Sequence, residues 1–97
     1  MIALDIGAGG SQLMKRDFPE ALVIRVDLDP AMKPDVVCDA RHLPFSGSID
    51  LAQAIHVLEH IPFPEMEEVL KEWVSVLKPG GKLVISFRIN DSLSSQS

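Results

Sequence analysis

The sequence is poor in cysteine, in clustered positive charge and in long apolar runs. Its single cysteine, Cys38, excludes an internal disulfide and fits a reducing compartment. No apolar run approaches the roughly 20 residues that a membrane-spanning helix needs. The N-terminus lacks the basic start and the apolar stretch of a signal peptide. We therefore expect a cytoplasmic protein with no part in a membrane.

The charge pattern argues against nucleic acid as a tightly held partner. The nine lysines and arginines are scattered along the chain, and the formal net charge is −5. Binding to a phosphate backbone draws on clustered Lys and Arg side chains. With 97 residues, the chain is long enough for one domain with a modest core.

A glycine-rich turn follows the first apolar segment. Residues 2–6 predict a short buried strand, residues 7–10 read Gly-Ala-Gly-Gly, and a helix over residues 11–18 is expected to follow. A strand that runs into such a turn at the start of a helix brings unpaired backbone N–H groups together. Glycine also tolerates positive φ and lets a ligand approach the main chain. The pattern predicts a site for an anionic or zwitterionic small ligand.

The remaining segments predict four more strands and one long helix. Residues 28–34 are expected to be loop, because Pro30 and Pro34 disfavour a helix between them. In the long helix, Pro64 suits the first position and Trp73 belongs to an apolar stripe that faces the core. The expected strands are residues 21–26, 35–38, 50–55 and 82–87, and the expected helix is residues 64–78.

The expected strands are mostly continuous apolar runs, which are typical of parallel strands covered on both faces. With helices or long connections between them, they indicate an α/β fold. Right-handed crossovers favour a Rossmann-like, doubly wound parallel sheet of about five strands in the order 3-2-1-4-5. A ligand should then bind at the carboxyl ends of strands 1 and 4, where the winding direction changes.

Three carboxylates, Asp5, Asp27 and Asp39, lie at or just beyond the carboxyl ends of expected strands. Asp27 follows Gly7 by about 20 residues, where an acid can accept hydrogen bonds from ribose hydroxyls. The dinucleotide pattern G-x-G-x-x-G would need a glycine where Gln12 stands. Asp39 is placed to accept from an adenine amino group. Each acid could instead cap a turn.

Seven stretches in this order resemble the class I S-adenosylmethionine-dependent methyltransferases, of the type 11-like group. They cover about residues 2–87 of the chain. The stretches are Leu-Asp-Ile-Gly-Ala-Gly-Gly, Val-Asp-Leu-Asp-Pro, Asp-Val-Val-Cys-Asp-Ala, Leu-Pro-Phe, Ile-Asp-Leu-Ala, Val-Leu-Glu-His-Ile and Leu-Lys-Pro-Gly-Gly-Lys-Leu.

The resemblance implies that S-adenosylmethionine is the cofactor and assigns roles to individual residues. The glycine turn would hold the methionine part, the acid after strand 2 the ribose, and Leu28 the adenine ring. Asp39 and Ala40 would contact the adenine edge. Ala54, Ile55 and His56 would line the methyl-transfer side. His56 is the candidate base, and whether His56 or His60 takes part in the chemistry stays open. The implied cofactor-binding residues are Asp5, Gly7, Ala8, Gly9, Asp27, Leu28, Asp39, Ala40, Ala54 and Ile55.

Two other functions and one other chemistry compete with this interpretation. A binding module could keep the cofactor site without catalysis. A nicotinamide-dependent oxidoreductase is disfavoured by Gln12 and by the absence of a candidate hydride-transfer partner. Residues 56–60, His-Val-Leu-Glu-His, match the zinc-peptidase pattern H-x-x-E-H. However, Pro62 and Pro64 prevent a long helix from carrying the two histidines, and we expect no metal.

The sequence departs from the family in what it lacks. The connection between strands 2 and 3 is short and has no helix, although Met32 could cover part of that face. The resemblance implies seven strands and N-terminal helices, whereas no segment here corresponds to strands 6 and 7. We expect residues 1–89 to form a minimal cofactor-binding domain and residues 90–97 a disordered polar tail. Strand 5 would be an exposed edge, so a second copy or a partner subunit is expected to cover it and to complete the site for an unknown methyl acceptor.

Overall fold

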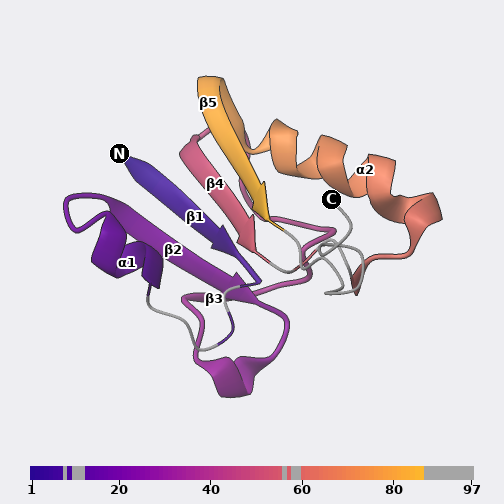
Figure 1. Ribbon diagram of the computed structural model, residues 1–97, viewed down its shortest axis with the longest axis horizontal. Coiled ribbons are helices and arrows are strands. Elements are labelled where there is room, and N and C mark those ends of the chain that lie inside the picture. The colour runs from indigo at the N-terminus through magenta and orange to yellow at the C-terminus, as the bar shows by residue number, and fades with distance from the viewer. Residues whose placement is uncertain (8, 10–12, 56, 58–59, 87–97) are drawn as a thin grey trace, which may run out of the picture.

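A computed structural model describes residues 1–7, 9, 13–55, 57 and 60–86 of the chain. Its five strands form one parallel sheet in the order β3-β2-β1-β4-β5 (Figure 1). This order confirms the doubly wound α/β sheet predicted from the sequence. The strands are β1 (Ile2–Ile6), β2 (Leu22–Asp27), β3 (Val36–Val37), β4 (Ile49–Ile55) and β5 (Leu77–Ser86).

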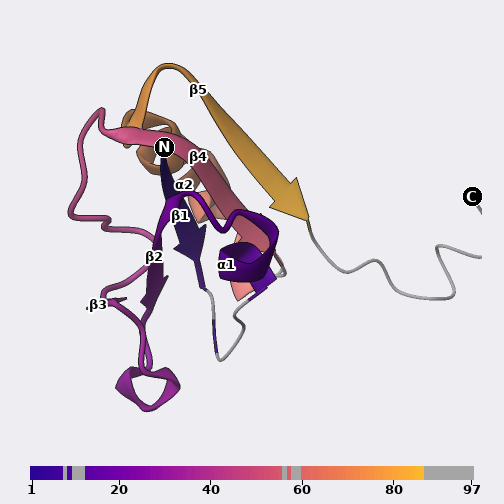
Figure 2. The ribbon, with the colours of Figure 1, turned by 90° about the vertical axis from the view of Figure 1, so that its left-hand side faces the viewer.

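Two helices cover opposite faces of the sheet, α1 (Leu13–Asp17) and α2 (Phe63–Ser75) (Figures 1 and 2). Successive side chains of a strand point to opposite faces, so neighbouring residues of β1 join different clusters. Ala3 packs with Met14 of α1, whereas Leu4 and Ile6 belong to the cluster that includes α2. Each face of β1 is therefore buried, as its continuous apolar run predicts.

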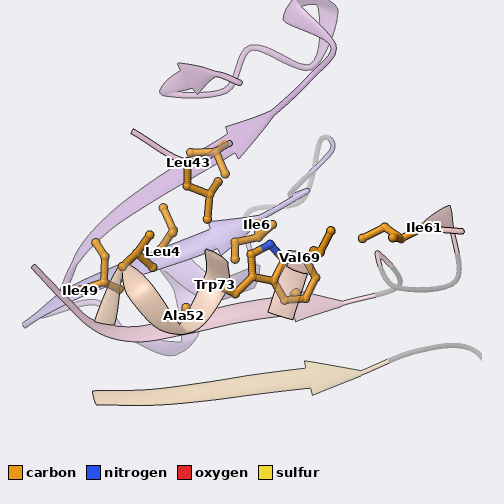
Figure 3. Packing of buried hydrophobic residues seen from close by; sticks show 11 residues of the cluster. Leu4, Ile6, Leu43, Ile49, Ala52, Ile61, Val69 and Trp73 are labelled. Atoms are coloured by element: carbon orange, nitrogen blue, oxygen red, sulfur yellow. The ribbon is translucent and has the colours of Figure 1, made fainter. Parts of the chain in front are cut away.

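The larger cluster lies between α2 and the sheet and is centred on Trp73. This side chain is fully buried among residues of β1 and β4, as Figure 3 shows, and the prediction that it belongs to the core is confirmed. Burying an aromatic side chain of this size contributes on the order of 2–3 kcal/mol to folding. The buried members of the cluster are Leu4, Ile6, Val26, Leu43, Ile49, Ala52, Ala54, Ile61, Val69, Trp73 and Val76.

The end of the long helix was predicted wrongly. α2 ends at Ser75 rather than residue 78, and β5 begins at Leu77 rather than residue 82. The backbone N–H of Gly47 donates to the Ser75 carbonyl at 3.1 Å, and the N–H groups of residues 48 and 49 donate to the Val76 carbonyl at 3.0 Å. These tertiary hydrogen bonds satisfy the last helical carbonyls, so the chain leaves the helix early and Leu77 pairs with Ile49.

The segment between β2 and β3 also differs from the prediction of a loop without helix. Pro30–Met32 forms one 3₁₀ turn, η1. The Asp29 side chain accepts from the Ala31 N–H at 2.9 Å, and Pro30 starts the turn, where its missing N–H costs nothing. Met32 is 42% exposed, so it does not cover the sheet as suggested.

Smaller differences affect other boundaries. β3 is limited to Val36–Val37, and α1 ends at Asp17 rather than at residue 18. Residues 11 and 12 of the expected first helix and residues 90–97 of the expected tail lie outside the described residues. Within the described part of the chain, β5 pairs only with β4 and forms one edge of the sheet. No helix there is long and apolar enough to cross a membrane.

Candidate functional site

A cavity of about 250 Å³ lies at the carboxyl ends of β1, β2 and β3. The sequence predicts a ligand at the ends of strands 1 and 4, and of the residues after β4, Val57 reaches this cavity. Carboxyl ends of parallel strands meet at one edge of the sheet, which brings distant segments of the chain together here. Five of the predicted cofactor-binding residues line this cavity: Gly7, Asp27, Leu28, Asp39 and Ala40.

The other predicted residues have different surroundings. Asp5 is buried and does not line the cavity, and Gly9 contacts the side chain of Asp27. At the end of β4, Ala54 is fully buried in the main core, while Ile55 is 40% exposed. Ala8 and the candidate base His56 lie outside the described residues.

The Asp27 carboxylate links the glycine turn to the end of β2. Its Oδ2 accepts from the Gly9 N–H at 2.8 Å, and its Oδ1 accepts from the Asp29 N–H at 2.9 Å. An ionised carboxylate has about four acceptor positions, so each oxygen can accept a further hydrogen bond. The backbone thus fixes the orientation of this carboxylate and leaves it able to bind donor groups of a ligand.

Asp39 caps a turn, as one of its two predicted roles required, and it also lines the cavity, while contact with an adenine amino group stays a prediction. Its Oδ1 accepts from the Arg41 N–H at 2.9 Å, and its carbonyl accepts from the His42 N–H at 2.9 Å. These local hydrogen bonds hold the chain in a tight bend directly after β3.

Helix α2 fixes the segment that follows Asp39. The indole Nε1–H of Trp73 donates to the Ala40 carbonyl at 2.8 Å, and the Leu43 N–H donates to Glu72 Oε2 at 2.8 Å. The half-exposed Arg41 guanidinium lies 3.0 Å from Glu65 Oε1. The residue that anchors the main core therefore also sets the position of the peptide carbonyl at Ala40. The sequence predicted Trp73 as core but not this second role.

Gly7 occupies a position that only glycine fits. Its φ of +64° lies in the left-handed region, and a Cβ built there would lie 2.6 Å from Val57 Cγ2. Gly9 also has positive φ, at +57°, but a Cβ there would have no heavy atom within 4 Å. Backbone conformation therefore requires glycine at both positions, and close packing requires it only at Gly7.

Asp5 is a buried carboxylate beneath the glycine turn, with 6% of the residue exposed. Its neighbour across the β1–β2 ladder is Arg25. Burial raises the pKa of Asp5 from its usual 3.8 to about 6, and the positive charge of Arg25 opposes part of that rise.

Several residues of the site were not predicted from the sequence. Val57, His60 and Ile61 line the cavity, as does Cys38, which belongs to the expected strand over residues 35–38 and was given no role in the site. Burial, with the charges of Asp39 and Asp27, raises the pKa of the Cys38 thiol. Arg25, which donates to the Gly9 carbonyl of the glycine turn, was also not predicted. The one signal for it in the sequence is a charged residue inside the apolar run of β2.

No group of three or more His, Cys, Asp or Glu side chains in the described ranges lies close enough to hold a metal ion. Of the H-x-x-E-H motif, residues 56, 58 and 59 fall outside those ranges, and α2 begins only at Phe63. The zinc interpretation of that motif is therefore not tested.

The strand order defines a Rossmann-like α/β fold with a cavity at the carboxyl ends of its strands, and comparison with known proteins identifies the family. The methyltransferase-domain family matches residues 4–85. The chain belongs to this family of S-adenosylmethionine-dependent enzymes, and S-adenosylmethionine is the family's cofactor.

Among similar proteins, the sterol 4-C-methyltransferase strm-1 of Caenorhabditis elegans is 43% identical over 51 residues, which are 52% of this chain and 15% of that protein. The PH0226 protein of Pyrococcus horikoshii OT3 is 26% identical with a TM-score of 0.82, over 98% of this chain and 49% of that one. The phosphoethanolamine N-methyltransferase 2 of Haemonchus contortus, solved in complex with S-adenosyl-L-methionine, is 23% identical with a TM-score of 0.74. That match covers 99% of this chain and 27% of that one. The chain thus spans half or less of the length of these relatives.

The two glycines predict a graded effect of added methyl groups. Gly7→Ala should destabilise the protein more than Gly9→Ala. Each substitution costs about 1 kcal/mol or more of stability because of the positive φ, and only the alanine at position 7 also clashes with the side chain of Val57. Val57→Ala in the Gly7→Ala background should recover part of that difference. Urea unfolding of the three variants measures these effects. Equal losses at Gly7 and Gly9 would contradict the contact with Val57.

Asp5 predicts a component of stability that falls as the pH rises. Because its folded-state pKa of about 6 exceeds the usual 3.8, the folded protein holds this proton more tightly than the unfolded chain. The free energy of unfolding should therefore decrease between about pH 4 and pH 6. Asp5→Asn removes this decrease. The free energy of unfolding of the variant should therefore rise relative to that of the wild type between about pH 4 and pH 6, as measured by unfolding at each pH.

Asp50 supplies a control of opposite sign for Asp5. The Ile2 N–H donates to Asp50 Oδ2 at 2.8 Å, and Lys78 lies 3.3 Å from Oδ1. The hydrogen bond from Ile2, helped by Lys78, lowers the pKa of Asp50. Asp50→Asn should therefore lose stability relative to the wild type as the pH rises toward about 4, because a lowered pKa places this gain in stability at and below the usual value of 3.8, whereas the Asp5 effect lies above it. The same trend in both variants would contradict the assignment.

Proposed function

We propose that this chain is the cofactor-binding part of an S-adenosylmethionine-dependent methyltransferase and that the cavity after β1–β3 holds the nucleoside of the cofactor. The observation that carries the proposal is the Asp27 carboxylate at the cavity wall. Gly9 and Asp29 fix its two oxygens, and acceptor positions remain for the two ribose hydroxyls.

Three other residues that line the cavity, Leu28, Asp39 and Ala40, are consistent with binding of the adenine ring. Leu28 is 66% exposed and gives an apolar surface on which the ring would pack. Asp39 and Ala40 would contact its edge, with the Ala40 peptide held by Trp73. A cavity of about 250 Å³ is slightly below the roughly 300–1,000 Å³ of complete ligand sites. It fits the nucleoside, while the methionine part would lie over the glycine turn of Gly7, Ala8 and Gly9.

The chemistry of the cofactor fits this acidic site, since it carries a sulfonium and an amino acid but no phosphate. When bound, S-adenosylmethionine supplies an activated methyl group for in-line displacement at carbon. The protein contributes alignment of the acceptor and exclusion of water. Ile55, at the exposed end of β4, is proposed to border the acceptor side, and the fully buried Ala54 would support that position from the core. His56 is proposed as the base for acceptors that must lose a proton.

The acceptor itself stays open. Two relatives have names that specify a sterol carbon and the nitrogen of phosphoethanolamine, which have little chemistry in common. The chain spans only part of either protein. We propose that the acceptor site is completed by a second copy of the chain, or by another subunit, which covers the edge strand β5. Val84 on this strand is 45% exposed, and β5 has no second neighbour in the described sheet.

Titration with S-adenosylhomocysteine, compared with NAD, tests the proposed function. The wild type should bind S-adenosylhomocysteine and not NAD. Asp27→Ala should lose on the order of 1–3 kcal/mol of binding free energy, because it removes the acceptor of the ribose hydroxyls. Asp29→Ala is the matched control, since the Asp29 side chain caps η1 and does not line the cavity. Unchanged affinity of Asp27→Ala would remove the residue from the site.

A separate assay with S-adenosylmethionine as the methyl donor distinguishes catalysis from binding alone. Methyl transfer to any member of a broad acceptor panel would support the enzyme. Tight binding of S-adenosylhomocysteine without transfer to any of them would instead favour a non-catalytic module.

Association through β5 predicts a particle of about twice the chain mass of 10.6 kDa in light scattering after gel filtration. Val84→Lys places a charge on the exposed strand and should shift the protein toward the monomer. Val74→Lys, at an exposed position of α2, is the control and should not do so. A monomer that transfers methyl groups by itself would rule out the requirement for a second subunit.

A further inference from the structure

Arg25 is a buried charge that the proposed function does not use. It lies in the centre of β2 and is 4% exposed. Its Nη2 donates to the Gly9 carbonyl at 2.6 Å, and its Nη1 donates to the Lys33 carbonyl at 3.1 Å. The Met32 carbonyl lies 3.5 Å from Nη2. Because burying a cation is costly unless it is hydrogen-bonded or paired, these carbonyls and the neighbouring Asp5 carboxyl help Arg25 to stay in the sheet.

Arg25 and Asp27 hold the same residue of the glycine turn by its two polar groups. Asp27 Oδ2 accepts from the Gly9 N–H, and Arg25 Nη2 donates to the Gly9 carbonyl. Residues 25 and 27 are two apart on one strand, so their side chains leave the same face of the sheet. Side chains of β2 therefore set the positions of the N–H and the carbonyl of Gly9. Without them the turn would be less fixed, because glycine can adopt many backbone conformations.

The same guanidinium also reaches the segment after β2. The Met32 and Lys33 carbonyls belong to the end of η1, which projects beyond β2 in Figures 1 and 2. Lys33 adopts a left-handed φ of 52°, which is unusual for a side chain of this kind. Arg25 thus ties the turn after β1 to the segment that begins with Leu28, and both lie at the proposed nucleoside cavity.

We propose that Arg25 is a positioning residue for the cofactor: it holds the Gly9 carbonyl and the carbonyls of residues 32–33 so that the turn and Asp27 present a preformed site. The proposal rests on the proposed function. Arg25 needs no contact with the cofactor to act in this way. Its planar guanidinium directs several N–H groups in fixed directions, whereas a lysine ammonium acts as a single point. A positive charge alone at position 25 should therefore not be sufficient to hold the turn and Asp27 in position.

Three variants of β2 separate positioning from simple stabilisation. Arg25→Met removes the hydrogen bonds and keeps much of the apolar stem, and Arg25→Lys keeps the charge. Val23→Ala is the matched control, because Val23 lies on the same face of the same strand, is 7% exposed, and packs near Ala3 and Met14. All three are compared at a temperature at which each chain is folded, as judged by its own unfolding curve.

Two readouts are measured for each variant. The first is the dissociation constant of S-adenosylhomocysteine from calorimetric titration. Arg25→Met and Arg25→Lys should each weaken it about 10-fold or more, as expected when hydrogen bonds from a charged group are lost, while Val23→Ala should change it little. The second is hydrogen exchange of the Gly9 amide without ligand. Exchange should accelerate in both Arg25 variants relative to amides of β4, and not in Val23→Ala.

The outcomes distinguish this inference from the proposed function. A wild type that does not bind S-adenosylhomocysteine overturns the proposed function and, with it, the cofactor role of Arg25. A wild type that binds, with Arg25→Met binding equally well, overturns only the positioning role. Equal weakening by Val23→Ala assigns the effect to global stability. Wild-type affinity in Arg25→Lys shows that charge is sufficient and contradicts the geometric argument.

Discussion

The hydrogen bond from the Gly9 N–H to the Asp27 carboxylate joins the two segments on which the site depends. It connects the turn after β1 to the end of β2, and it forms only if these strands are parallel neighbours in the observed register. The same carboxylate receives the Asp29 N–H, so the segment after β2 is oriented by the same group. Carboxylates that accept backbone N–H bonds are strongly held, which makes this a rigid reference point for the cavity.

The part of the site around Ala40 is supported from the face of the sheet that carries α2. Trp73 fills the main core and holds the Ala40 carbonyl, and Glu72 holds the Leu43 N–H. The ion pair between Arg41 and Glu65 is half exposed and contributes little by comparison. Packing energy in the core is thus used directly to fix a backbone carbonyl at the cavity. The smaller cluster around Met14 holds α1 on the other face.

The strand order and the meeting of Asp27 with the glycine turn were predictable because they depend on patterns within short stretches. Continuous apolar runs indicate parallel strands, and glycines and acids at strand ends indicate a ligand site. The end of α2 was not predictable, since it depends on hydrogen bonds from residues 47–49, far away in the sequence. The hold of Arg25 on Gly9 was missed for a similar reason. A single arginine in an apolar run shows that something unusual occurs there, but the acceptors become visible only in three dimensions.

Among the described residues, those that line the cavity belong to the first 41 positions of the chain or are Val57, His60 and Ile61. Within residues 63–86, Trp73 and Glu72 of α2 support the cavity from behind, through their hydrogen bonds to Ala40 and Leu43. The residues that line the cavity are thus largely separate in sequence from those that support it. Sequence changes in the described segments after Phe63 would leave the lining of the cavity unchanged as long as α2 keeps its core face. A fold with this organisation can change its later segments while it keeps the same cavity.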